Sequence, residues 1–183
     1  MATTQNQKTL KPEKSWFLLV AAAFVVLTFA FVIVPYMDPK RSAEPTQELP
    51  AFDLPLLGPD EGARLRSTDL GGKLLLLDFW ASWCQPCREQ TKLLVNVAGE
   101  LGQRVRIVGV ATSEARAQSS AYLASHPTPF ENLYDENGEL SSALSVSGLP
   151  TLVLVGQNGQ IVSRTTGGID RNELFLMVEG SKR

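Results

Sequence analysis

The chain has 183 residues and a formal net charge of −2, with a sequence pI near 5.5. This length allows one ordinary domain plus a small additional segment, and the slightly acidic balance gives no indication of a nucleic-acid partner. Only two cysteines are present, Cys84 and Cys87, so a framework of several disulfides and a four-cysteine zinc site within one chain are excluded. A zinc site shared between two chains stays open at this point.

The N-terminal region has the pattern of a membrane anchor. Residues 16–34 contain no charged side chain, and a helix of this length spans about 29 Å, close to a hydrocarbon core of about 30 Å. A cleaved signal peptide is the alternative, but this apolar run is longer than such peptides need and ends without a small-residue cleavage pattern. We therefore predict a polar segment over residues 1–14 and a transmembrane anchor over residues 15–36.

The charges that flank the predicted anchor indicate its orientation. Three lysines precede the span, whereas Lys40 and Arg41 follow it. Because positive flanks favour the cytoplasmic side, we expect the N-terminus in the cytoplasm and the rest of the chain on the extracytoplasmic side of a cell membrane. Residues 37–50 combine three prolines with charged and small residues, which predicts a semi-extended linker. The soluble domain is predicted over residues 51–183.

The domain is predicted to open with a β-hairpin and a buried strand. Apolar residues alternate with others over 52–56 and 63–66, on either side of a turn sequence. Next, Leu74–Leu77 is an unbroken apolar run preceded by two glycines. Such a run is typical of a central strand that is buried on both faces.

The two cysteines follow this strand with the spacing C-x-x-C. Pro86 between them suits the first turn of a helix, where its missing N–H is not needed. Cys84 is therefore predicted at the N-terminus of a helix, where free N–H groups and the helix dipole favour a thiolate. Cys87 lies about one turn later on the same face, close enough for a disulfide with Cys84. We expect one exposed and one sheltered sulfur.

The remaining elements alternate between helices and strands and end in a hairpin. They are predicted, in chain order, as a helix that stops at Gly102, a strand over 105–110, a helix over 114–125 that Ser113 caps, a short strand over 132–134, a short helix over 140–144, a strand over 152–155, a turn at Asn158-Gly159, its partner strand over 160–166 and a last helix that Asp170 and Glu173 cap. Ala117, Ala121, Leu123 and Ala124 are expected on the inner side of their helix. This order predicts an α/β fold in which helices flank a mixed central sheet.

The segments DFWASWCQPC and GLPT make the chain similar to the thioredoxin superfamily. The N-terminal hairpin, the inserted helix before Ser125 and the predicted transmembrane helix resemble the TlpA/ResA-like branch of membrane-anchored thiol–disulfide oxidoreductases. The resemblance covers residues 50–180. It implies a thioredoxin fold with an N-terminal hairpin and an inserted helix, and a redox-active disulfide in place of any cofactor or metal.

The resemblance also implies roles for individual residues. Cys84 matches the attacking thiolate, Cys87 the resolving thiol, and Pro150 the cis-proline that packs beside the disulfide; a turn proline is the alternative for Pro150. Leu149 would offer its backbone to an extended client segment. We assign Thr151, next to Pro150, and Trp83, which is expected to cover the surface around the cysteines, to substrate binding as well.

Asp78 is predicted to be a buried acid. A carboxyl group within LLLLDFW is unfavourable unless it has a partner or takes up a proton, and a raised pKa would let it accept the proton of Cys87. An exposed strand-end aspartate is the alternative. The position matches the buried acid of thioredoxin, whereas the TlpA/ResA-like branch often has asparagine there. Gln90 and Lys92 stand where that branch usually has an acid and a proline, so we expect no proline kink in the helix.

The sequence therefore predicts a membrane-anchored thiol:disulfide oxidoreductase. It would reduce exported client proteins that contain disulfides, such as apocytochromes c, and would be reduced again by a membrane thiol donor. A disulfide-donating oxidase remains open, because the motif does not set the direction of electron flow. A copper-delivery module that uses His126 is an alternative of another class, although a loop position is the simpler interpretation of that histidine. Other open interpretations are a peroxidase and a scaffold with an idle motif.

Overall fold

A computed structural model of the chain describes residues 20, 23–24, 27, 47–58 and 62–181. The chain divides into two compact units, residues 1–45 and 46–183, which are treated separately. Val20, Ala23, Phe24 and Leu27 are helical and exposed. The rest of the predicted anchor and the linker up to residue 46 lie outside the described residues. Within the described part of the chain, no helix has the length and apolar character needed to cross a membrane.

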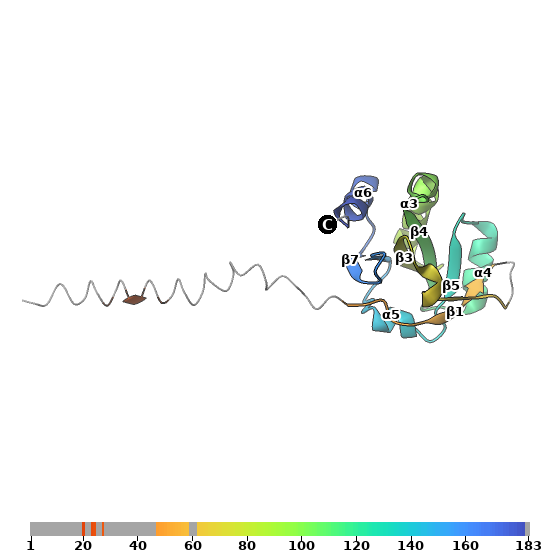
Figure 1. The fold of residues 1–183 in the computed structure, drawn as a ribbon. Helices are drawn as coiled ribbons and strands as arrows, with labels where there is room; N and C mark the ends of the chain where they lie inside the picture. Colours follow the sequence, from red (N-terminus) through yellow and green to blue (C-terminus); the bar gives the residue numbers. More distant parts are fainter. Residues whose placement is uncertain (1–19, 21–22, 25–26, 28–46, 59–61, 182–183) are drawn as a thin grey trace, which may run out of the picture. The chain divides into compact units, whose positions relative to one another are not determined.

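The domain is organised around a mixed seven-stranded sheet, with the order β2-β1-β5-β4-β3-β6-β7 among the described residues (Figure 1). The central strand β3 pairs in parallel with β4 and antiparallel with β6, as a mixed sheet requires. The strands are β1 (Asp53–Leu57), β2 (Arg64–Arg66), β3 (Leu74–Trp80), β4 (Val105–Ala111), β5 (Glu131–Tyr134), β6 (Thr151–Val155) and β7 (Ile161–Thr166). The predicted hairpins β1–β2 and β6–β7 are both confirmed.

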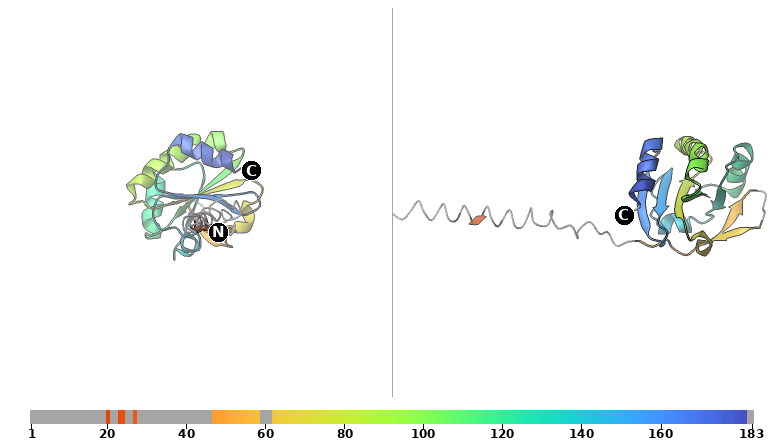
Figure 2. Two further views of the ribbon diagram at one scale, coloured as in Figure 1. Left: turned by 90° about the vertical axis from the view of Figure 1, so that its left-hand side faces the viewer. Right: turned by 45° about the horizontal axis from the view of Figure 1, so that its top comes forward.

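Helices cover both faces of this sheet. They are η3 (Ser67–Leu70), α3 (Gln85–Leu101), α4 (Arg116–Ser125), α5 (Glu139–Ala143) and α6 (Arg171–Gly180). Figure 2 shows α3 and α6 side by side on one face, where Leu94 and Leu174 pack on Leu76. On the opposite face, Leu140 of α5 packs with Leu77. Because side chains alternate along β3, even-numbered residues of this strand face α3 and odd-numbered residues face α5.

The local signals at helix ends are confirmed in two places and wrong in one. Gly102 ends α3, and Asp170 caps α6 through the Glu173 N–H. The helix α4, however, begins at Arg116 with Ala115 as its N-cap, not at residue 114. Ser113 adopts a left-handed φ of 62° and caps nothing.

The inner face of α4 differs from the prediction except at Leu123, which packs against the cysteine cluster. Ala117, Ala121 and Ala124 are exposed, whereas Ser119 is fully buried. The physical reason is a hydrogen bond, because the Ser119 hydroxyl donates to the Glu114 carboxylate at 2.5 Å. The polar contact of Ser119, together with the packing of Tyr122 and Leu123 against the cysteine cluster, therefore sets which side of α4 faces the domain.

The described end of the predicted linker is bonded to the β6–β7 hairpin. The Leu49 N–H donates to the Gly159 carbonyl, and the Ile161 N–H donates to the Gln47 carbonyl, each at 2.8 Å. The Leu49 side chain packs against the core on the α5 side of the sheet. Residues 47–49 thus lie against the domain itself.

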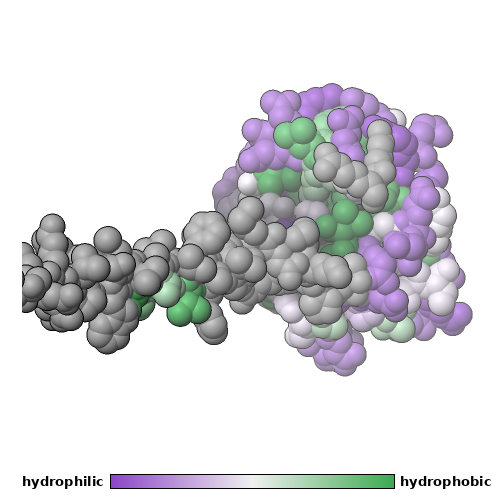
Figure 3. All heavy atoms as spheres, turned by 60° about the vertical axis from the view of Figure 1, so that its left-hand side comes forward, coloured by the Kyte–Doolittle hydropathy of each residue, from purple (hydrophilic) through white to green (hydrophobic). Residues whose placement is uncertain are grey.

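The surface of the domain is mostly polar. On the face drawn in Figure 3, hydrophilic residues form most of the rim and hydrophobic residues gather toward the middle. Among the described residues of the domain, the large hydrophobic side chains that are clearly exposed are Trp83, Val162 and Leu176. Trp83 directly precedes Cys84 in sequence, so this exposed aromatic side chain belongs to the segment that follows the end of β3.

Candidate active site

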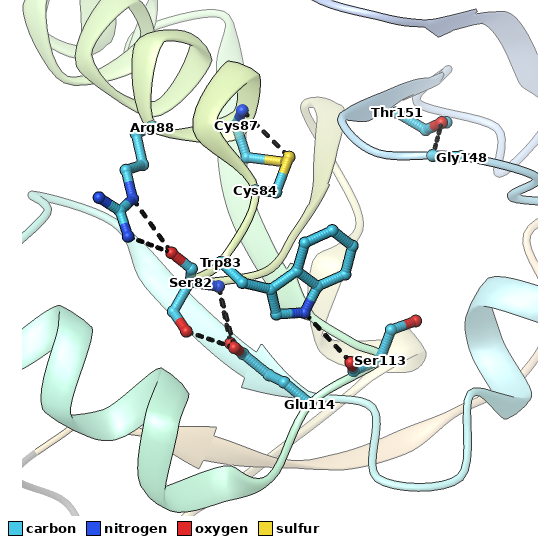
Figure 4. The surroundings of a disulfide bond; sticks show 9 residues. All are labelled: Ser82, Trp83, Cys84, Cys87, Arg88, Ser113, Glu114, Gly148 and Thr151. Atoms are coloured by element: carbon cyan, nitrogen blue, oxygen red, sulfur yellow. Dashed lines mark hydrogen bonds between the residues drawn. A yellow bond between two sulfur atoms is a disulfide. The ribbon is translucent and has the colours of Figure 1, made fainter.

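The two cysteines form a disulfide at the start of α3, as the spacing predicts. The chain leaves β3 at Trp80, and Cys84 is the N-cap of α3. Cys84 is bonded to Cys87, and its Sγ accepts a hydrogen bond from the Cys87 backbone N–H at 3.2 Å (Figure 4). Backbone N–H groups at a helix N-terminus stabilise negative charge. A thiolate that forms at Cys84 on reduction is therefore stabilised in this position.

The prediction of one exposed sulfur is wrong for the oxidised protein. Cys84 is 4% exposed and Cys87 is 1% exposed. Both belong to a buried cluster with Trp80, against which Leu149 packs. Trp80 comes from the end of β3, just before the motif, whereas Leu149 lies far from it in sequence, and packing from both buries the disulfide. Cys84 remains the more accessible of the two cysteines.

The GLPT segment lies beside this cluster. The peptide bond between Leu149 and Pro150 is cis, which agrees with the cis-proline of the predicted family. Leu149 and Trp83 line one cavity of about 290 Å³, and Trp83 is 61% exposed. A larger cavity of about 610 Å³ lies elsewhere in the domain and is lined by none of the predicted site residues. The smaller cavity is therefore the one that belongs to the site.

Thr151, which is predicted to bind substrate next to Pro150, has a side chain that is turned into the domain. Its side chain is fully buried, and its hydroxyl lies 2.7 Å from the Gly148 carbonyl, to which it donates, and 3.0 Å from the Thr166 hydroxyl. A buried and bonded hydroxyl does not face a client. Thr151 instead fixes the turn that precedes Pro150.

Asp78 is buried, which confirms that part of the prediction and removes the exposed strand-end interpretation. It is 1% exposed, and neither carboxylate oxygen has a hydrogen-bond partner among the described residues. Burial without a partner raises the pKa of Asp78 from 3.8 to about 7, because desolvation disfavours the charged form. Asp78 is an even-numbered residue of β3 and so points to the face that α3 covers. A carboxyl group that titrates near neutral pH is suited to accept and return a proton.

Gln90 places an amide where the branch usually has an acid. Gln90 is 2% exposed, and its Oε1 accepts the Ile169 N–H at 2.9 Å, while its Nε2 has no partner among the described residues. The helix α3 runs without interruption through Gln90 and Lys92. Among the described residues, Asp78 of β3 and Gln90 of α3 are therefore a buried carboxyl group and a buried amide on the side of the sheet that α3 covers.

Trp80 and His126 occupy the structural positions that the sequence predicts. Trp80 is 2% exposed, and its Nε1 donates to Asn132 Oδ1 at 3.1 Å. His126 is an exposed residue at the C-terminus of α4, and its ring stacks on Tyr122 at 4.4 Å between centroids. In the part of the chain that the structure describes, no group of three or more His, Cys, Asp or Glu side chains is arranged to hold a metal ion.

The sequence interpretation missed a set of contacts at Ser82. Glu114 accepts hydrogen bonds from the Ser82 backbone N–H, and Arg88 donates to the Ser82 carbonyl. Glu114 comes from the loop after β4, 32 residues away. No spacing rule connects these positions; the only available signal was an acidic residue shortly after the end of a buried strand.

A disulfide at a helix N-terminus, beside a cis-proline at the end of a mixed α/β sheet, defines a thioredoxin-fold thiol–disulfide oxidoreductase. A family model described as thioredoxin-like matches residues 71–161. The chain is 32% identical to the thiol:disulfide interchange protein DsbE of Pseudomonas fluorescens biotype C, over 86% of this chain and 88% of that protein. It is 30% identical to the thiol-disulfide oxidoreductase ResA of Bacillus subtilis (strain 168), over 70% of each.

The solved structures agree with these sequence matches. The chain resembles a secreted Mycobacterium tuberculosis disulfide oxidoreductase homologous to E. coli DsbE, with a TM-score of 0.60 and 27% identity, over 70% of this chain and 95% of that one. The protein belongs to the ResA/DsbE family of thioredoxin-like thiol–disulfide oxidoreductases. Its redox group is the disulfide between Cys84 and Cys87.

Proposed function

We propose that this protein reduces disulfides in exported client proteins. The observation that carries the proposal is the position of Cys84 at the N-cap of α3, where the Cys87 N–H bonds its sulfur. The reduced Cys84 thiolate attacks one sulfur of a client disulfide, forms a mixed disulfide and releases the other client sulfur as a thiolate. The Cys87 thiolate then attacks Cys84 Sγ and releases the second client thiolate. Two electrons pass to the client, and the Cys84–Cys87 disulfide forms again.

Three further residues support this sequence of steps. Asp78 accepts the Cys87 proton, because its buried carboxyl group has a pKa of about 7. Leu149 offers its backbone to an extended client segment, and Trp83 provides an exposed aromatic surface next to it. Both line the cavity next to the disulfide cluster, which is consistent with a client that approaches from this side.

The proposed clients are the haem-binding cysteine pairs of apocytochromes c. Support comes from the resemblance to the TlpA/ResA-like branch and from the relatives named ResA and DsbE. To remain reduced in an oxidising compartment, the protein needs a donor, which we propose to be a membrane thiol protein. The same domain would act as an oxidase if its disulfide were the stronger oxidant, so the direction of transfer is the quantity to test.

The direction is tested with a synthetic peptide that contains an oxidised CxxCH segment. The reduced full-length chain is expected to reduce this peptide nearly to completion, with stoichiometric formation of the Cys84–Cys87 disulfide, because electrons flow to the less reducing couple. Chromatography of peptide thiols measures the result, and Cys84→Ser serves as the inactive control. If equilibrium lies instead with oxidised peptide and reduced protein, the chain is an oxidase and the proposed direction fails.

We also propose that residues 15–36 anchor the protein in a cell membrane with the domain on the extracytoplasmic side. The support is the uncharged run over residues 16–34 and the lysines that precede it. The full-length chain should stay with membranes after washing at alkaline pH. Release into the soluble fraction would contradict the anchor.

A further inference from the structure

The peptide group of Ser82 is held from both sides. Its N–H lies 2.9 and 3.0 Å from the two carboxylate oxygens of Glu114, and its hydroxyl also donates to Glu114. Its carbonyl accepts two hydrogen bonds from the Arg88 guanidinium, at 3.0 and 2.7 Å (Figure 4). Hydrogen bonds to charged groups are stronger than those between neutral groups. Ser82 is therefore fixed by one anion and one cation that come from different elements.

Glu114 is itself held in place. The Ser119 hydroxyl donates to its carboxylate at 2.5 Å, and the Tyr134 hydroxyl donates to its backbone carbonyl at 3.0 Å. Ser119 is a fully buried residue of α4, so the inserted helix supports the acid directly. This arrangement also explains why α4 begins after Glu114, because the Glu114 carboxylate is hydrogen-bonded to Ser82.

Arg88 is supported by an aromatic ring. Its guanidinium carbon lies 5.6 Å from the Tyr122 ring centroid, and the Tyr122 ring lies 5.5 Å from that of Trp80. The guanidinium thus makes a cation–π contact with Tyr122 as well as its hydrogen bonds to the Ser82 carbonyl. Tyr122 also belongs to α4, so the inserted helix supports both halves of the Ser82 contact.

The segment between Ser82 and Cys84 is short and has a third fixed point. The Trp83 indole N–H donates to the Ser113 carbonyl at 3.3 Å, and Ser113 has a left-handed φ of 62°. A non-glycine residue adopts this conformation rarely, and it is found where surrounding contacts impose it. Glu114, Arg88 and Ser113 together restrain two consecutive residues immediately before the Cys84 sulfur.

We propose that Glu114 and Arg88 are positioning residues for the redox reaction: they fix the Ser82 peptide and thereby hold Cys84 Sγ over the N-terminus of α3. The inference rests on the proposed role of Cys84 as the attacking thiolate. The inserted helix α4 then has a function, because it supplies the contacts that align both charged groups. Without them, Cys84 loses the fixed geometry in which the Cys87 N–H bonds its sulfur.

The test is the rate at which iodoacetamide alkylates the reduced full-length chain at pH 7, with mass mapping of the first labelled cysteine. Glu114→Ala is expected to slow alkylation of Cys84 about fivefold, as for the loss of one net hydrogen bond. Glu114→Gln keeps an oxygen that accepts from Ser82 and should recover most of the rate. Glu131→Ala is the matched control, since it removes a carboxylate paired with Arg106 outside the site, and should alkylate as the wild type does.

Substitutions of Arg88 test the hydrogen bonds to the carbonyl of the same Ser82 peptide. Arg88 is exposed, so its replacement removes no buried side chain. Arg88→Ala is expected to slow alkylation about as much, and Arg88→Lys to recover part of the rate. Arg171→Ala is its control, because Arg171 also lies over an aromatic ring and pairs with an acid elsewhere.

Wild-type rates for both alanine variants would overturn the positioning role. A Glu114→Gln rate as low as that of Glu114→Ala would overturn it too, because a retained acceptor for the Ser82 N–H would then restore nothing. First labelling at Cys87 in the wild type would instead contradict the underlying assignment of Cys84. The failure of the inference and the failure of the proposed function are therefore distinguishable.

Discussion

Replacing Cys87 with serine is expected to trap client proteins on Cys84 as stable mixed disulfides. Cys84 retains its place at the N-cap of α3, so the first attack proceeds, but no second thiol remains to release the adduct. Catalytic turnover should fall by roughly three orders of magnitude or more, as when one member of a reacting pair is lost. Non-reducing electrophoresis of the full-length variant measures the adducts, and dithiothreitol should reduce their mixed disulfides and release the clients.

The matched control for this trap is the variant that lacks both thiols. Cys84→Ser combined with Cys87→Ser should form no adduct with the same clients. Adducts that persist in the double variant, or no dithiothreitol-sensitive adduct in the Cys87→Ser protein, would show that Cys84 is not the nucleophile. Cys84 is only 4% exposed in the oxidised protein, so adduct formation also requires that its sulfur becomes accessible to a client.

Replacing Asp78 with asparagine is expected to slow the second step and leave the first nearly unchanged. The carboxyl group is buried without a hydrogen-bond partner among the described residues, and burial raises its pKa to about 7. As pH rises through 7, the wild-type carboxylate forms and can accept the Cys87 proton, whereas asparagine cannot. Loss of a general base is expected to lower the rate of the second step roughly 100-fold or more. Decay of a preformed mixed disulfide between pH 6 and 9 measures the effect, and equal rates would remove Asp78 from the mechanism.

The stability of the same variant checks the state of the carboxyl group independently. In the unfolded chain Asp78 loses its proton near pH 3.8, whereas the folded protein keeps it up to about pH 7. The unfolded state therefore binds fewer protons between these values, and the free energy of unfolding falls as pH rises, by about 4 kcal/mol in total. Asparagine does not titrate, so the free energy of unfolding of Asp78→Asn should lack this pH-dependent fall. The difference in unfolding free energy between the variant and the oxidised wild type should therefore shift in favour of the variant from pH 4 to pH 7. A difference in unfolding free energy that does not change with pH would contradict the burial of an ionisable carboxyl group at Asp78.

Features that depend on residues close in sequence could be predicted from the sequence. The apolar run before Asp78 predicts the buried strand β3, because a strand with both faces covered needs no polar alternation. The dipeptide Asn158-Gly159 predicts the β6–β7 hairpin through its turn chemistry. The C-x-x-C spacing with Pro86 places Cys84 at a helix start. Each signal lies within a few residues of the structure that it specifies.

Features that depend on contacts between distant segments could not be predicted in this way. The start of α4 is determined by Glu114, whose carboxylate bonds Ser82 from 32 residues away. The burial of Thr151 follows from its contact with Thr166 across the β6–β7 pair. Part of the burial of the disulfide cluster comes from Leu149, which lies far from both cysteines in sequence. None of these contacts leaves a periodic pattern in the sequence.

The central claim, that the Cys84–Cys87 pair gives electrons to clients, is tested most directly by its reduction potential. The full-length protein is equilibrated with mixtures of reduced and oxidised dithiothreitol or glutathione, and its free thiols are counted by alkylation and mass spectrometry. We predict a potential of about −270 mV, in the range of thioredoxin, which makes the pair a reductant that needs a donor. A value of about −120 mV would make it a strong oxidant and would contradict the proposed direction of transfer.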